Sequence, residues 1–259
     1  MRVTMIVIKT PSEIETMRRA GILAAEALRA VARAVRPGIS GQELDTIGEE
    51  YIRARARGGT PSFKGYRGFP GSICLSFNDE VVHGIPGGRR LKEGDVVSID
   101  LGAEVDGFHA DLAGTFSVGE VSRDLARLLK VSRESLYKAI DAVRPGNRLG
   151  DVGAAVQTHV EAAGFNVVRD FAGHGIGRHL HEEPQIPNFG EPGTGQPLRI
   201  GMTLAIEPMV NAGGYEVTMD DDGWTVRTKD HKPSAHFEHT VAVTENGALV
   251  LTAIPDGVV

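Results

Sequence analysis

The sequence is poor in cysteine, with Cys74 alone among 259 residues. One cysteine excludes an internal disulfide framework and is typical of proteins in a reducing compartment. Long apolar runs are also missing, because no stretch reaches the ~18 residues of a membrane-spanning helix. The N-terminal MIVIKT segment is too short for a secretory signal and lacks a small-residue cleavage site. We therefore expect a cytoplasmic protein that has no membrane partner.

A surplus of basic residues is absent as well, since the formal net charge is -6. Nucleic-acid binding depends on neutralising phosphates with Lys and Arg, so direct nucleic-acid specificity is not expected. The RARAR run at 53–57 is the densest basic patch and is interpreted as a solvated helix face. The remaining composition, 41% apolar and 24% charged residues, is that of a globular chain with ample core material.

Two helices are predicted within the first 58 residues. Ser12 with Glu15, and Ser40 with Glu43, form capping-box patterns in which each side chain can satisfy the other's amide. The RPG sequence at 36–38 ends the first helix, because proline disfavours helix in the residue before it. Apolar residues at three- and four-residue steps predict one buried stripe, made of Ile14, Met17, Gly21, Ala24, Leu28, Val31 and Val35.

The chain contains an internal repeat. AVRPG occurs at 34–38 and 142–146, and LKEGDVVSID at 91–100 matches LRIGMTLAIE at 198–207. The offsets, 108 residues for AVRPG and 107 for the second match, nearly agree and indicate a duplication far longer than a solenoid repeat. We predict a single domain over 1–259, built from two pseudo-symmetric halves at about 12–118 and 119–252. Each half reads as two helices and then strands, which predicts an α+β fold with helices on one face of a mainly antiparallel sheet.

A hairpin is predicted in the first half, where Asp106-Gly107 separates two β-rich segments. A two-residue turn there places Gly102 opposite Asp111, so Asp100 and Asp111 become diagonal neighbours on one face, about 7–8 Å apart. Two converging carboxylates without a basic partner repel each other, and a bound cation relieves that repulsion.

The duplication places two more acidic residues at matching positions. Glu207 corresponds to Asp100, and Glu238, in a strand expected over 235–244, corresponds to Asp111. A single Asp or Glu near a strand end is more often a turn former or a surface charge. Four such residues in a symmetric arrangement instead predict a site for about two divalent ions, about 3.5–4 Å apart.

His174, in GHGIG, is the candidate imidazole ligand of this site. The flanking glycines allow the backbone to approach closely without side-chain obstruction. Carboxylates with one imidazole suit Mn, Fe(II) or Co better than structural zinc, which favours Cys and His.

Five motifs together resemble methionine aminopeptidase, in its short bacterial type I form. They are NDEVVHGIP at 78–86, the Asp100/Asp111 pair, GHGIGRHLHEEP at 173–184, IEPMV at 206–210 and FEHT at 237–240. Only 32 residues separate His174 from Glu207, which leaves no room for the inserted helical subdomain of type II enzymes. The resemblance covers essentially the whole chain and implies the pita-bread fold, a curved sheet covered by helices.

The resemblance also implies two divalent metal ions (Co, Mn or Fe(II)) at the active site. Asp111 and Glu238 are expected to bridge the two ions, Asp100 to chelate one, and His174 with Glu207 to hold the other. A water between the ions is acidified and attacks the first peptide carbonyl.

The catalytic residues that the resemblance implies are Glu207, His181 and His83. Glu207 is the expected proton shuttle, and His181 the donor to the developing oxyanion. His83 is expected to contact the nitrogen after the scissile bond, although such a loop histidine read alone is a turn-capping residue. His179 matches no family role and is expected to lie on the surface.

Tyr66, Phe69, Cys74 and Trp224 match the family's pocket for an unbranched methionine side chain, where sulfur–aromatic contacts help. The chain departs from relatives at the pocket rim, where Leu180 replaces a frequent Phe and Phe63 replaces an occasional Cys. A further departure is His236, where relatives often carry Gln. His236 shares a face with Glu238, as His109 does with Asp111. Asn78 and Ser234 resemble positions of a monovalent-cation site.

The implied activity is removal of the N-terminal methionine from nascent proteins and peptides when the second residue is small. We expect a monomer that associates transiently with the ribosome. A prolidase or aminopeptidase P has the same fold and ligands but normally carries a separate N-terminal domain, for which this chain has no residues. A non-catalytic binding module of this fold loses ligands, and a creatinase-like enzyme lacks the acidic set, whereas all five ligand positions are filled here.

Overall fold

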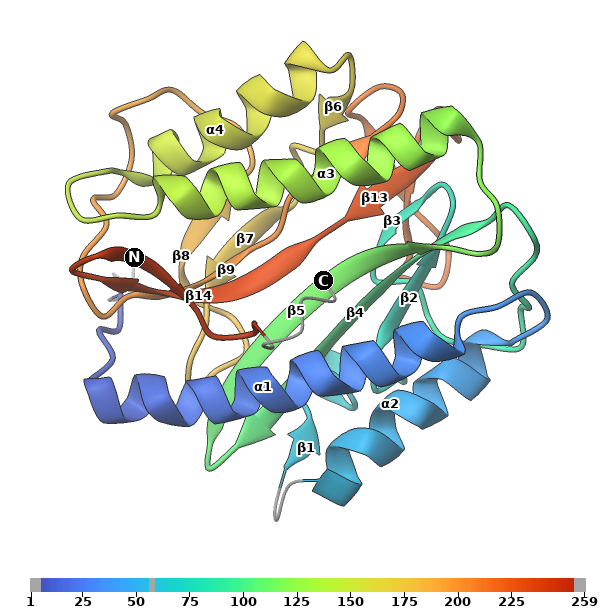
Figure 1. The fold of residues 1–259 in the computed structure, drawn as a ribbon, viewed down its shortest axis with the longest axis horizontal. Coiled ribbons are helices and arrows are strands. Elements are labelled where there is room, and N and C mark those ends of the chain that lie inside the picture. The colour runs from blue at the N-terminus through green and yellow to red at the C-terminus, as the bar shows by residue number, and fades with distance from the viewer. Residues whose placement is uncertain (1–5, 56–58, 254–259) are drawn as a thin grey trace.

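A computed structural model describes residues 6–55 and 59–253, which form two successive rounds of helices followed by strands (Figure 1). The first round begins with α1 (Pro11–Ala34) and α2 (Gly41–Arg55), and the second with α3 (Arg123–Ala142) and α4 (Leu149–Ala162). The strands of the first round are β1 (Thr60–Pro61), β2 (Cys74–Phe77), β3 (Glu80–Val82), β4 (Val96–Val105) and β5 (Phe108–Ser117). A 3-10 turn, η1 (Tyr66–Gly68), lies between β1 and β2.

The second round supplies ten strands. They are β6 (Asn166–Val167), β7 (Ala172–Gly175), β8 (Glu182–Pro187), β9 (Thr203–Ile206), β10 (Met209–Asn211), β11 (Val217–Met219), β12 (Val226–Thr228), β13 (Ser234–His236), β14 (Glu238–Thr244) and β15 (Gly247–Val250). Within the described ranges, no helix is long and apolar enough to cross a membrane.

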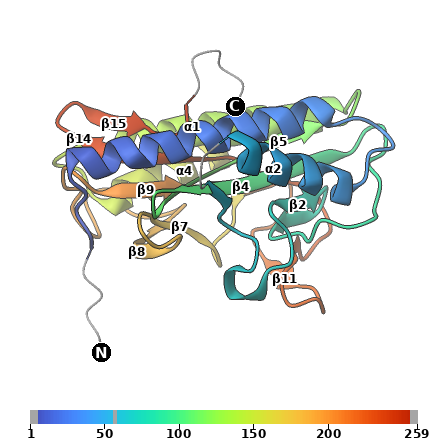
Figure 2. The same ribbon diagram turned by 90° about the horizontal axis from the view of Figure 1, so that it is seen from below.

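The strands form one large sheet and two small ones. The large sheet has the order β1-β4-β5-β14-β9-β7-β8, with β2 added beside β4 and β15 beside β14. The small sheets are β13-β10-β6 and β11-β12-β3, and every strand pair among the described residues is antiparallel. Figure 2 shows the helices on one side of the large sheet, and β11 of a small sheet on the other side. The predicted α+β arrangement is therefore confirmed.

Two apolar cores hold the helices on the sheet. The first lies between α1, α2 and the strands β2, β4 and β5, and the second between α3, α4 and the strands β9 and β14. The central pair β5–β14 joins the two sets of strands, with Glu238 opposite Ala113 and His239 opposite Leu112. Residues from both rounds of the chain therefore meet at the middle of the large sheet.

The helix ends confirm one predicted cap and correct the other. Ser40 and Glu43 exchange the two bonds of a capping box, with Oγ of Ser40 accepting from the Glu43 amide at 3.2 Å. The first helix is instead capped by Thr10 and Glu13, so the predicted Ser12–Glu15 box was wrong. Pro11 explains the shift, because proline is favoured at the first helical position and places the cap at the residue before it.

The predicted hairpin and its register are confirmed. Asp106 and Gly107 have φ of 51° and 77°, the two positive values of a type I′ turn. Gly102 lies opposite Asp111, as expected, so Asp100 and Asp111 are diagonal neighbours on one face.

The strand expected over 235–244 is interrupted. His236 ends β13 in a small sheet, Phe237 lies between the strands, and Glu238 begins β14 in the large sheet. His236 and Glu238 are therefore not successive residues on one face of a single strand, which corrects that prediction.

Candidate active site

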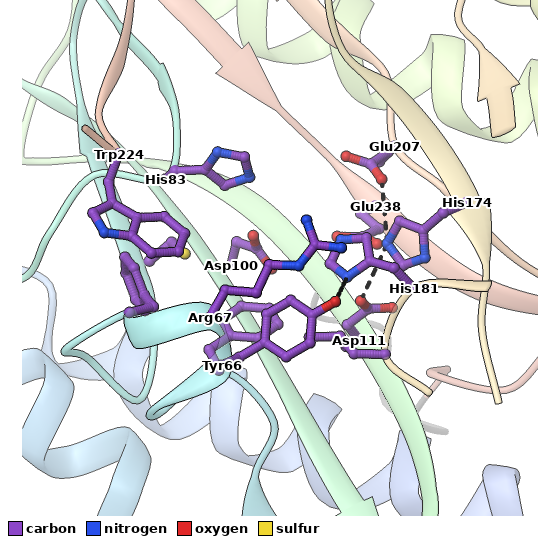
Figure 3. Close-up of a pocket in the computed structure, with 14 residues that line it drawn as sticks. Tyr66, Arg67, His83, Asp100, Asp111, His174, His181, Glu207, Trp224 and Glu238 are labelled. Atoms are coloured by element: carbon purple, nitrogen blue, oxygen red, sulfur yellow. Dashed lines mark hydrogen bonds and ion pairs between the residues drawn. The ribbon is translucent and has the colours of Figure 1, made fainter. Parts of the chain in front are cut away.

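A cavity of about 140 Å³ opens at the middle of the large sheet, on the side away from the helices (Figure 3). It is lined by every residue for which the sequence predicts a divalent-metal, catalytic or methionine-pocket role. Its lining consists of Phe63, Tyr66, Arg67, Phe69, Cys74, His83, Asp100, Asp111, His174, Leu180, His181, Glu207, Trp224 and Glu238.

Four carboxylates converge on one wall of this cavity. Asp100 and Asp111 come from the β4–β5 hairpin, Glu207 follows the end of β9, and Glu238 begins β14. Asp111 and Glu238 are buried, whereas Asp100 and Glu207 are partly accessible from the cavity. Burial, followed by repulsion from Asp111, raises the pKa of both Asp100 and Glu207. Burial likewise raises the pKa of Glu238 and of Asp111. The four groups therefore do not all stay ionised unless a cation joins them.

His174 on β7 faces these carboxylates. Its Nε2 lies 3.7 Å from Oδ2 of Asp111 and 3.6 Å from Oε1 of Glu207 (Figure 3). Its Nδ1 lies 2.9 Å from the Gly175 carbonyl oxygen, to which it donates, so the Nε2 lone pair is directed at the carboxylates. Burial lowers the pKa of His174 to about 4, which keeps the imidazole neutral and able to bind a metal at pH 7.

The glycines that flank His174 have the predicted purpose. A Cβ on Gly173 would lie 2.3 Å from the Ala205 carbonyl oxygen, and one on Gly175 would lie 2.2 Å from that of Glu183. Residues without a Cβ are therefore needed for β7 to sit between β8 and β9.

The donor set fits a divalent cation. Asp111, His174 and Glu238 offer ligand atoms that all lie within 4.8 Å of one another. Asp100 and Glu207 line the same cavity but stand outside this tightest group. Oδ1 of Asp100 is buried without a hydrogen-bond partner, an arrangement that is costly for a carboxylate unless a cation contacts it.

His181 lies beside the metal-ligand candidates, at the mouth of the cavity. Its ring is 4.1 Å from that of His174, between ring centres, and it stacks on Tyr66 at 5.3 Å. The Nδ1 of His181 is 3.0 Å from the Tyr66 hydroxyl. Burial lowers the pKa of His181 to about 4, so the ring is neutral at pH 7. The neighbouring His179 is exposed and lines no part of this cavity, as expected.

Two further histidines flank the carboxylates. His83 has a positive φ of 61° and meets Phe171 edge to face at 5.7 Å between ring centres. Burial lowers the pKa of His83 to about 4 and that of His236 to about 3. His236 is 2% exposed, and its Nε2 lies 3.7 Å from Oε2 of Glu207 without a hydrogen-bond partner. His109 turns away, since its Nδ1 lies 2.9 Å from Oγ of Ser62.

The opposite wall is mainly apolar. Phe69 and Trp224 meet edge to face at 5.1 Å between ring centres, and Phe63, Cys74 and Leu180 pack in the same cluster. Burial raises the pKa of the Cys74 thiol, which leaves it as a neutral apolar lining group. These residues form the apolar part of the cavity lining.

Arg67 is the lining residue that sequence reasoning missed. It is exposed, has a positive φ of 49°, and its guanidinium lies 5.4 Å from the Tyr66 ring centre. Its position directly after Tyr66 was the one feature of the sequence that could have suggested a place near the cavity. Nothing in the sequence indicates that the backbone turns Arg67 toward the cavity mouth.

Asn78 and Ser234, which were expected at a monovalent-cation site, lie next to each other. The Ser234 amide donates to the Asn78 carbonyl oxygen at 2.8 Å, and Oδ1 of Asn78 accepts from the Val96 amide at 3.0 Å.

Comparison with known proteins places this geometry in a family. The model of metallopeptidase family M24 matches residues 15–245. Methionine aminopeptidase of Clostridium perfringens is 53% identical over 96% of this chain and 100% of that protein, and methionine aminopeptidase 1 of Bacillus subtilis is 52% identical over the same shares. The crystal structure of methionine aminopeptidase from Thermotoga maritima, 51% identical, superposes with a TM-score of 0.94 over 96% of this chain and 100% of that one.

The fold extends to more distant relatives. Prolidase from Pyrococcus furiosus superposes with a TM-score of 0.77 at 24% identity, over 96% of this chain and 66% of that one, a likeness of fold alone. The predicted pita-bread fold is thereby confirmed. The chain belongs to metallopeptidase family M24, alongside the bacterial methionine aminopeptidases.

Proposed function

We propose that this chain removes the N-terminal methionine from peptides and nascent proteins by metal-dependent hydrolysis of the first peptide bond, when the second residue is small. The observation that carries the proposal is the group of four carboxylates and His174 on one wall of a cavity whose other wall is apolar. Relatives about half identical over the whole chain, named methionine aminopeptidase, support the same substrate.

The metal site is proposed to take two divalent ions, with Co, Mn or Fe(II) suited to the donors. Asp100, Asp111, His174, Glu207 and Glu238 would hold these ions. When bound, such ions lower the pKa of a shared water and polarise the scissile carbonyl. The unpartnered Oδ1 of Asp100 supports its role as a ligand.

Three residues of the chain are assigned to the chemistry. Glu207, whose pKa is raised by burial, can accept the proton of the attacking water and return it to the leaving amine. His181, held at Nδ1 by Tyr66, can donate from Nε2 to the oxygen that becomes negative in the transition state. His83, on the other side of the cavity, is assigned to the nitrogen after the scissile bond (Figure 3).

The apolar wall is assigned to the methionine side chain. Tyr66, Phe69 and Trp224 offer aromatic faces and edges to a thioether, and Cys74 with Leu180 completes the lining. Leu180 and Phe63 shape the rim, so we propose that they tune relative rates on different second residues.

The wider assignments rest on the family resemblance. They are a single catalytic domain over 1–259 with two similar halves, a monomeric state, a cytoplasmic location and transient association with the ribosome. A monovalent cation near Asn78 and Ser234 belongs to the same group of proposals.

One comparison of substrates tests the activity. The protein is freed of metal, reloaded with Mn, Fe(II) or Co, and assayed on Met-Ala-Ser and on Xaa-Pro peptides. We expect divalent-dependent release of methionine from Met-Ala-Ser. No activity with any of the three metals would reject the enzyme assignment, and a preference for Xaa-Pro would move the protein to a prolidase-like activity.

A further inference from the structure

A buried ion pair lies next to the active-site loop. Nζ of Lys9, in the segment before α1, contacts Oε2 of Glu182, and the two side chains are only 3% and 7% exposed. Lys9 is itself anchored, because its amide donates to the Gly201 carbonyl oxygen at 2.8 Å. A charge-assisted bond between anchored, dehydrated groups restricts both partners much more than a surface pair does.

Glu182 closes the loop that precedes it. Its second oxygen, Oε1, accepts from the His179 amide at 3.1 Å, and the Gly177 amide donates to the His179 carbonyl oxygen at 3.1 Å. A Cβ on Gly177 would lie 2.4 Å from Cε of Lys9 and 2.8 Å from Oε1 of Glu182, so the ion pair fills the space under the loop. The segment 177–182 therefore packs directly against the Lys9–Glu182 pair.

This segment carries Leu180 and His181 into the cavity. His181 directly precedes Glu182. Anchoring the Glu182 carboxylate therefore fixes the backbone at His181 and, with it, the position of the imidazole. We propose that Lys9 is a positioning residue, which holds the 177–182 loop through Glu182 so that His181 and Leu180 face the substrate. The inference rests on the proposed function for its catalytic consequence.

A second ion pair links the same two parts of the chain and provides a matched control. Arg178 of the loop pairs with Glu13 of α1 at 3.4 Å, but these side chains are 63% and 31% exposed. Solvent screening makes such a pair weak, so its loss should leave the loop in place. Removing Lys9 instead leaves the Glu182 carboxylate buried without its counter-charge, which water or a proton must then satisfy.

The test combines amide hydrogen exchange with kinetics on Met-Ala-Ser, in metal-loaded protein. In Lys9→Met, we expect exchange of the 177–182 amides to rise at least tenfold while exchange in β4 and β5 stays within about twofold. We expect kcat to fall about tenfold, a part of the 10²–10³-fold that loss of an oxyanion donor costs. Divalent-ion affinity should not change, since His174 lies on β7 outside the loop.

Arg178→Gln should leave exchange and kcat within about twofold of the parent. Lys9→Met/Glu182→Gln, which removes both charges and keeps an acceptor for the His179 amide, should recover the stability lost through the unpaired carboxylate but not the lost kcat, because the bond that holds the loop is still missing. Should Lys9→Met not fold, Glu182→Gln gives the same two readouts.

Unchanged exchange in 177–182, or an equal effect of Arg178→Gln, would overturn the positioning role. If the parent protein releases no methionine, the proposed function fails, and hydrogen exchange still decides whether Lys9 holds the loop.

Discussion

The imidazole of His181 stacks on the ring of Tyr66, and the Tyr66 hydroxyl lies 3.0 Å from Nδ1 of His181. Because the phenol is the natural donor to a neutral imidazole, this bond places the ring proton on Nε2. His181 then presents an N–H to the cavity, where the substrate carbonyl would lie. Tyr66 thus sets the tautomer of His181 as well as lining the cavity.

Tyr66→Phe removes this bond and keeps the stacking. A hydrogen bond of about 0.5–1.5 kcal/mol corresponds to a kcat lower by about twofold to twelvefold, with metal content unchanged. Steady-state kinetics on Met-Ala-Ser measures the loss. In the His181→Ala background the same substitution should cost nothing further, and a full additional loss there would refute the coupling of the two residues.

Gly173→Ala tests the close approach of β7 and β9. The new Cβ would lie 2.3 Å from the Ala205 carbonyl oxygen, so we expect a loss of about 1–3 kcal/mol in the free energy of unfolding, measured by urea denaturation. Divalent-ion affinity should fall as well, because His174 follows directly. Gly88→Ala is the control, since a Cβ at Gly88 meets nothing within 4 Å. Equal stability of the two variants would contradict the packing argument.

The metal-free protein should become less stable as pH rises above the ordinary carboxyl pKa of about 4. Folding raises the pKa of Asp100, Glu207 and Glu238, so their contribution to stability is complete below their ordinary pKa of about 4 and is lost as pH rises through the raised values.

Burial has the opposite effect on the site histidines. It lowers the pKa of His174 to about 4, so that contribution is present above pH 6.5 and is lost only as pH falls toward 4. Above pH 6.5 the His174 contribution is constant, so the raised pKa values of the carboxyl groups should make the melting temperature fall as pH rises. Saturating Mn²⁺ should remove most of this slope. A metal-free melting temperature that is constant or rises over this range would contradict the raised pKa values.

Asp100→Asn should separate stability from function. The substitution removes one buried negative charge, so the metal-free variant should melt at a higher temperature than the parent at pH 8. The added amide is a poor ligand, so Mn²⁺ should stabilise the variant much less than the parent. Thermal melts with and without Mn²⁺ measure both effects, and equal Mn²⁺ stabilisation of the two proteins would remove Asp100 from the ligand set.

Local patterns predicted the parts of the fold and site that depend on nearby residues. The Asp106-Gly107 turn fixed the β4–β5 register, and with it the shared face of Asp100 and Asp111, because a two-residue hairpin allows only one alignment. The internal repeat predicted that Glu207 and Glu238 belong to the same site, and both line the same cavity.

Features that depend on tertiary packing were not predictable. Whether residues 235–244 form one strand depends on which sheet each part joins, and the break at Phe237 has no local signal. The Lys9–Glu182 pair joins residues 173 positions apart, and each residue alone reads as a surface charge. In contrast, the Thr10 cap could have been predicted from the sequence, because Pro11 marks the first helical position and the cap is the residue before it.

The central claim is that His174 and the four carboxylates bind divalent metal at the catalytic site. Calorimetric titration of Mn²⁺ into metal-stripped parent and His174→Ala, followed by assay on Met-Ala-Ser, tests it most directly. We expect the variant to lose one of about two metal equivalents and to release no methionine. A variant that binds Mn²⁺ with the parent's stoichiometry and remains fully active would contradict the claim.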